Sequence, residues 1–154
     1  IYLPDLKYLD SDAAGRYSGA SDYPQTAQAA IREMVRQTGP CAFDGDGLLT
    51  RGVVIRHLIL PGQVSQAKAV MDWVAAEFGP GTVLFSLMSQ YTPWGRSAEF
   101  PEIHRRLRAG EMRAAAEYMA NLGLEGFTQE RTSAQREYTP PFDLTGVAGE
   151  GGAL

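Results

Sequence analysis

Polar side chains stand inside or directly after three apolar runs of this 154-residue chain. The first run ends in Asp5 and Lys7, the second contains Arg56, and the third is followed by Gln90 and Tyr91. These side chains carry hydrogen-bond donors and acceptors of the kinds that bind polar ligands. In sheets of parallel strands, ligands gather at the carboxyl ends of the strands. The residues therefore predict a polar ligand site at that edge of a sheet.

Each of these residues also has a structural interpretation. Asp5 and Lys7 share one face of an extended chain and can form a local ion pair. A guanidinium inside an apolar run is costly unless its donors are satisfied, so Arg56 either meets a ligand or forms a salt bridge, for example with Asp5. Ser89 and Gln90 also fit a purely structural role as the polar residues that terminate a strand. The residues alone leave both interpretations open.

Other reactive side chains give weaker signals. We expect His57 to be a hydrogen-bonded residue beneath covering helices. Cys41 is the only cysteine, so this chain offers neither an internal disulfide nor a cysteine-based metal site. The sequence has no nucleophile elbow, phosphate loop, HExxH pair or dinucleotide fingerprint. His104 is expected on a solvated basic face with Arg105, Arg106 and Arg108.

Composition narrows the classes of partner. The net charge of −4 comes from 14 basic and 18 acidic residues with no run of Lys or Arg, which argues against nucleic acid and anionic membrane surfaces as partners. No apolar run approaches the roughly 20 residues of a membrane span, and no leader pattern is present. We therefore expect a cytoplasmic protein with one globular domain over residues 1–130. The Pro- and Gly-rich segment 131–154 is expected to be an extended, partly disordered tail.

Strand patterns alternate with helix patterns along the domain. Apolar runs typical of covered parallel strands are 1–6, 52–62 and 82–90. Helical spacing of apolar residues predicts helices over 25–39, 65–81 (with Ser65 as the cap) and 111–123. The alternation favours an α/β fold with a parallel sheet and covering helices.

The segment 42–52 interrupts this alternation. Its Asp-Gly repeat predicts a small inserted hairpin. A calcium loop is excluded, because Ile55 stands where such a loop needs its twelfth-position Glu.

Six short segments together resemble a known family. The chain is similar to the second half of the pyruvate formate-lyase activating enzyme group of radical S-adenosylmethionine proteins, in particular its uncharacterised iron–sulfur branch. The resemblance covers about residues 1 to 147 and rests on LPDLKY, RYSGASDYP, RGVVIRHLILPG, SLMSQYTP, FPEIHRRL and NLGLEGFTQ.

The resemblance implies an incomplete parallel (β/α)6 barrel. In that family, cysteines spaced CxxxCxxC hold a 4Fe-4S cluster that cleaves S-adenosylmethionine, and the deoxyadenosyl radical abstracts a hydrogen atom. The cysteine loop and the first strands of the barrel would precede Ile1. This chain would then be the C-terminal half of the enzyme, inactive alone and without bound cofactor. The implied partner of the parent enzyme is a glycyl-radical enzyme or another protein substrate.

The resemblance also assigns roles to individual residues. Asp5 and Lys7 match the family's Asp-x-Lys, which reaches the carboxylate and ribose of S-adenosylmethionine or a nearby monovalent cation. Arg56 matches the arginine that precedes a Pro-Gly pair. Gln90 and Tyr91 stand where the activating enzymes carry His, so hydrogen bonding to ribose or adenine is implied, but a role that needs imidazole is not.

A non-catalytic binding or assembly module that shares the fold is the alternative. The gene distinguishes the two hypotheses. A CxxxCxxC motif encoded upstream of Ile1 supports the enzyme, and a start codon just before Ile1 supports the module.

A half-barrel leaves the edge of its first strand and its inner face without their partners, and such surfaces associate. We predict that the fragment hides them against a second copy, against residues 138–147 of the tail, or against both. Light scattering at micromolar concentration is expected to report a dimer or larger species. A stable monomer with a disordered tail would contradict this prediction.

Overall fold

A computed structural model of the chain describes residues 1–129. The predicted tail, 131–154, lies outside the described residues. None of the helices in this part of the chain is long and apolar enough to cross a membrane. The helices are α1 (Ser11–Ser18), α2 (Tyr23–Thr38), α3 (Val64–Glu77), the short 3-10 helix η1 (Gly95–Glu99) and α4 (Ala109–Asn121). The strands are β1 (Ala42–Phe43), β2 (Leu49–Arg51), β3 (Val54–Leu58), β4 (Leu84–Met88) and β5 (Gly126–Gln129).

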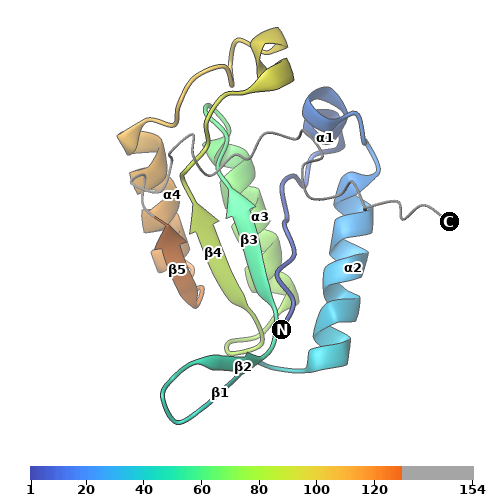
Figure 1. Ribbon diagram of the computed structural model, residues 1–154, viewed down its shortest axis with the longest axis vertical. Helices are drawn as coiled ribbons and strands as arrows, with labels where there is room; N and C mark the ends of the chain where they lie inside the picture. Colours follow the sequence, from blue (N-terminus) through green and yellow to red (C-terminus); the bar gives the residue numbers. More distant parts are fainter. Residues whose placement is uncertain (130–154) are drawn as a thin grey trace, which may run out of the picture.

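The central layer is a parallel sheet. It has the order β3-β4-β5, and the first residues of the chain join β3 through parallel bridges at Tyr2–Val53 and Asp5–Arg56. Neighbouring strands therefore follow one another along the chain, and Figure 1 shows them side by side. The predicted α/β fold with a parallel sheet and covering helices is confirmed.

The helices pack on one face of this sheet. α3 and α4 lie behind the strands in Figure 1, and α2 flanks the first segment of the chain. Alternate strand residues point toward the helices, because side chains alternate along a strand. The buried core consists of Leu6, Ile31, Val53, Ile55, Ile59, Ala67, Val70, Met71, Val74, Val83, Phe85, Leu87, Leu107, Ala115 and Met119.

The opposite face carries the remaining strand side chains, and none of the helices within residues 1–129 packs on it. We call it the open face. Its members are Leu3, Asp5, Val54, Arg56, Leu58, Leu84, Ser86, Met88 and Phe127.

Several details differ from the sequence-based expectation. Ile1–Leu6 was expected to be a buried strand, but Ile1 and Leu3 are 59% and 58% exposed, and of these six residues Leu6 lies fully in the core. Ser65 is not the cap of α3, because the helix begins at Val64 after Gln63. The sequence did not predict α1, η1 or β5.

β5 begins at a position that only glycine fits. Gly126 has φ 153°, and a Cβ there would lie 1.9 Å from the carbonyl oxygen of Phe85 on β4. The backbone of the two strands therefore approaches closely where β5 starts.

The predicted hairpin is confirmed. β1 and β2 pair antiparallel, and the hairpin projects from the amino ends of the central strands in Figure 1. The Asp44 carboxylate closes its turn by accepting hydrogen bonds from the backbone N–H groups of Asp46 and Leu48, at 3.0 and 2.9 Å.

At the carboxyl ends of the strands, Glu111 fastens two loops together. Its carboxylate pairs with the Arg105 guanidinium at 2.7 Å and accepts from the N–H groups of Gly62 and Arg108, at 2.7 and 2.8 Å. The Arg105 hydrogen bonds, aided by the two backbone donors, lower the pKa of Glu111 from 4.5 to about 2. The loop after β3 is thereby tied to the start of α4.

We predict that Glu111→Gln lowers the free energy of unfolding by about 1–3 kcal/mol, because charge-assisted bonds are lost. Since the folded state depresses the pKa of Glu111, its contribution is complete above about pH 4.5 and is lost as the pH falls toward 2. Urea denaturation between pH 2 and 7 measures both effects. Glu117→Gln, on the exposed side of α4, is the control and should change little. An equal loss in both variants would contradict the prediction.

Candidate functional site

The open face carries a charged pair at its centre. The Arg56 guanidinium donates from Nε and Nη2 to Oδ1 of Asp5, at 2.8 and 2.7 Å. The side chains are 42% and 37% exposed, so water reaches both groups. Of the two interpretations of Arg56, the salt bridge to Asp5 is therefore observed. The exposed pair remains accessible to a ligand, so a binding role stays a prediction.

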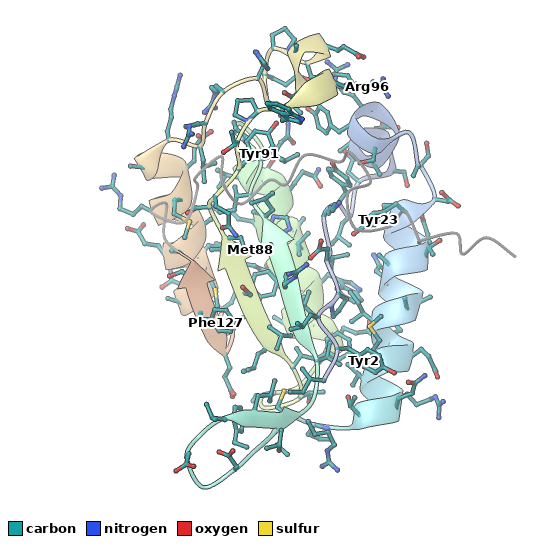
Figure 2. The ribbon with its side chains drawn as sticks, in the orientation of Figure 1. Tyr2, Tyr23, Met88, Tyr91, Arg96 and Phe127 are labelled. Carbon is teal, nitrogen blue, oxygen red and sulfur yellow. The ribbon has the colours of Figure 1, made fainter. Side chains whose placement is uncertain are left out.

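The other predicted ligand residues lie nearer the carboxyl ends of the strands. Lys7 is exposed and follows the paired segment of the first strand. Gln90 and Tyr91 follow shortly after β4, which ends at Met88, and are half-buried. Figure 2 shows Tyr91 above Met88. Burial raises the pKa of Tyr91, while a hydrogen bond with Ser97 opposes that shift. Direct contact joins Asp5 with Arg56, and the shared cleft with Lys7 and Gln90 stays a prediction.

The Tyr23 hydroxyl holds the segment that carries Asp5 and Lys7. It donates to the carbonyl oxygen of Asp5 at 2.7 Å and accepts from the backbone N–H of Lys7 at 3.0 Å. The ring packs edge-on against Tyr8, with centroids 5.8 Å apart. Tyr23 therefore fixes the backbone between the two predicted ligand residues from the side of α2.

His57 holds the same segment from β3. The backbone hydrogen bonds between the first segment of the chain and β3 end with the bond from the Leu6 N–H to the Arg56 carbonyl, at 2.9 Å. The carbonyl oxygen of Leu6 accepts a hydrogen bond from the side chain of His57 instead, with Nδ1 at 2.8 Å. The expectation that His57 is a hydrogen-bonded residue beneath the helices is confirmed. Burial lowers its pKa, with the bond to Leu6 opposing that shift, so the imidazole is neutral at physiological pH.

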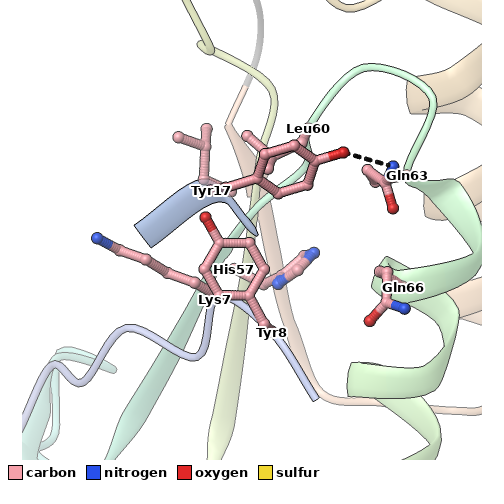
Figure 3. A pocket seen from close by; sticks show the side chains of 8 residues that line it. Lys7, Tyr8, Tyr17, His57, Leu60, Gln63 and Gln66 are labelled. Carbon is pink, nitrogen blue, oxygen red and sulfur yellow. Dashed lines mark hydrogen bonds between the residues drawn. The ribbon is translucent and has the colours of Figure 1, made fainter. Parts of the chain in front are cut away.

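A small hollow lies on the helix side, at the carboxyl ends of the first strand and β3 (Figure 3). It has room for about one water molecule, which is too little for a cofactor. The hydrogen bond drawn across it runs from Gln63 to the Tyr17 hydroxyl, at 3.3 Å. Its lining consists of Lys7, Tyr8, Tyr17, His57, Leu58, Leu60, Gln63 and Gln66.

The expected solvated basic face around His104 is wrong in part. Arg105 pairs with Glu111 and is half-buried. His104 is exposed, and its Nδ1 lies 3.1 Å from the Ser97 hydroxyl. The basic run thus serves partly to fasten the loop before α4.

The described residues offer no metal site. No group of three or more His, Cys, Asp or Glu side chains within 1–129 is placed to hold an ion. Cys41 is half-buried, with its sulfur near the carbonyl oxygens of Val53 and Thr82, at 3.9 and 3.6 Å.

Sequence reasoning missed Tyr23 and Glu111. Tyr23 binds two backbone groups, and Glu111 binds two backbone groups as well as Arg105. A backbone group is present at every residue, so the sequence does not reveal which residue a side chain binds in this way. A weak signal for Tyr23 was present, because Pro24 marks the first turn of a helix and thereby places Tyr23 at its start.

Comparison with known proteins gives a distant relative whose activity is uncharacterized. No family model matches the chain. The chain is 24% identical over 126 residues to the uncharacterized protein MJ0674 of Methanocaldococcus jannaschii, a match that covers 81% of this chain. The same match covers 32% of MJ0674, so the chain spans about a third of that protein's length.

We predict that Tyr23→Phe frees the backbone between Asp5 and Lys7, because both hydrogen bonds to the hydroxyl are lost. The free energy of unfolding should fall by about 1–2 kcal/mol, and amide exchange at Lys7 should accelerate. Hydrogen-exchange NMR measures the second effect. Tyr118→Phe, which loses a bond to Asp72 on the helical surface, is the matched control. It should leave Lys7 exchange unchanged, and equal acceleration in both variants would refute the proposed contact.

Proposed function

We propose that this chain is the C-terminal part of a radical S-adenosylmethionine iron–sulfur enzyme of the pyruvate formate-lyase activating enzyme group. The observation that carries the proposal is the Asp5–Arg56 pair on the open face of a parallel sheet. Neighbouring strands in chain order with helices on one side are typical of part of a (β/α) barrel, whose interior is lined by the face away from the helices. In this proposal the open face belongs to the interior of a (β/α)6 barrel.

The polar residues of the open face suit S-adenosylmethionine. The Asp5 carboxylate is an acceptor for hydroxyl or ammonium groups, and the planar Arg56 guanidinium suits a carboxylate or a pair of hydroxyls. Beyond the open face, at the carboxyl ends of the strands, Lys7 would add a second cation, and Gln90 and Tyr91 would offer hydrogen bonds to ribose or adenine. Bound S-adenosylmethionine would supply the radical that abstracts hydrogen from a glycyl-radical enzyme or another protein partner. We place this activity in the cytoplasm.

The residues of this chain do not fit the 4Fe-4S cluster. Such clusters need cysteine thiolates, and the sequence has only Cys41. The proposal therefore assigns the cluster ligands to sequence N-terminal to Ile1, and this chain alone should purify colourless and iron-free.

An assembly module is the second candidate. It is favoured by large apolar side chains at the surface of the first segment and β5. Ile1, Leu3 and Phe127 are 59%, 58% and 47% exposed. This candidate needs no cysteine motif before Ile1.

The two candidates are separated by purifying, without oxygen, the full-length protein from which the chain comes. The enzyme is expected to contain iron and sulfide, and to release 5′-deoxyadenosine from S-adenosylmethionine when reduced. A full-length protein without iron, or one that releases no 5′-deoxyadenosine, would refute the enzyme hypothesis.

In the full-length enzyme, Arg56→Ala should weaken S-adenosylmethionine binding by about 1–3 kcal/mol, because a charge-assisted bond is lost. Arg56→Lys keeps the charge but not the planar fork and should restore only part of the affinity. Arg51→Ala, in the exposed hairpin, is the control for loss of an arginine. Calorimetry with unchanged affinity for Arg56→Ala would remove Arg56 from the site.

A further inference from the structure

A line of polar residues crosses the open face. The strand registers pair Asp5 with Arg56 and Arg56 with Ser86, and the next residue in the line is Phe127 on β5. Residues in register on neighbouring strands point to the same face, and the strands are about 4.8 Å apart. We call Asp5, Arg56 and Ser86 the polar row. Phe127, labelled in Figure 2, closes the row on the β5 side.

Ser86 is the unexplained member of this row. The residue is 1% exposed, and its buried hydroxyl oxygen has no hydrogen-bond partner among residues 1–129. A buried hydroxyl without a partner destabilises a fold, so its presence calls for a physical reason. A ligand that accepts or donates at this position would provide one.

The charges around Ser86 indicate which ligand fits. Arg56 uses Nε and Nη2 to bind Asp5, and its other N–H donors have no partner among residues 1–129. The Asp5 carboxylate lies beside the Arg56 guanidinium, so one negative charge already neighbours the donors of the row. The Arg56 guanidinium can only donate hydrogen bonds, and the Ser86 hydroxyl on the neighbouring strand can also donate one. The matching group is a hydrogen-bond acceptor that carries no more than one negative charge.

We propose that Arg56 and Ser86 together bind a carboxylate, with the guanidinium and the hydroxyl donating to its oxygens. The proposal rests on the proposed function to the extent that the open face is the ligand site. It adds Ser86 to that site and names the chemical group that the polar row receives. A phosphate dianion would place two negative charges near the Asp5 carboxylate, so a carboxylate with one negative charge fits better.

Acetate is the probe for this site, because it presents the carboxylate alone. In a titration of the 154-residue chain followed by NMR, acetate should shift the Ser86 amide and the Arg56 Nε–H in a saturable way. Ser86→Ala should weaken acetate binding about fivefold, the loss expected for one hydrogen bond of about 1 kcal/mol. Ser65→Ala, on the exposed side of α3, should leave it unchanged. No saturable shift, an unaffected Ser86→Ala variant, or tighter binding of inorganic phosphate would overturn the proposal.

Thermal unfolding separates a binding role from a structural one. Without ligand, Ser86→Ala should leave Tm unchanged or raise it, because an unsatisfied buried hydroxyl is removed. A lower Tm would show that the hydroxyl stabilises the fold and would overturn the proposal. The proposed function, and not this inference, fails if acetate binds to the chain but the full-length protein does not bind S-adenosylmethionine. If S-adenosylmethionine binds with equal affinity to Ser86→Ala, this inference alone fails.

Discussion

The parallel pairing between the first residues of the chain and β3 is the constraint on which the rest depends. It sets Asp5 beside Arg56 and sends Leu6, the next residue, into the core with no exposed surface. A slip of one residue would exchange these positions, because side chains alternate along a strand. A carboxylate would then be buried among the helices without a partner, at a high cost in free energy. The register of this segment is therefore strongly specified.

The Asp5–Arg56 pair is a consequence of this architecture rather than its support. Both side chains are more than a third exposed, and exposed ion pairs contribute little to stability. Leu6 in the core, His57 at the Leu6 carbonyl and Tyr23 at the flanking backbone position the segment instead. The charged groups can thus reorganise around a ligand while the backbone beneath them stays fixed.

Periodicity could predict the elements that bury a continuous apolar face. Helix α3 is an example, because Ala67, Val70, Met71 and Val74 recur at helical spacing and are all fully buried. β5 escaped prediction, because it is short, begins with glycine and leaves Phe127 half-exposed. Its position depends on the close approach of Gly126 to β4, which is a tertiary feature.

The candidate site was predictable in residue types but not in contacts. Arg56 stood out as a charge in an apolar run, yet Asp5 lies 51 positions away in sequence, and only the strand register makes it the partner. Ser86 carried no signal, since serine inside a strand is ordinary until the structure shows its hydroxyl buried without a partner in the described part of the chain. Tyr23 binds backbone groups, and Glu111 binds backbone groups in addition to Arg105; backbone groups are supplied by any residue.

The hairpin of β1 and β2 allows the sequence to change in length without changing the candidate site. It projects from the amino ends of the strands, whereas the predicted ligand residues lie on the open face and at the carboxyl ends. Phe43 and Leu48 on it are 51% and 66% exposed, and exposed loop tips accept insertions readily. During evolution the stretch of sequence between Asp5 and Arg56 can therefore lengthen or shorten at the hairpin while their distance in space stays constant.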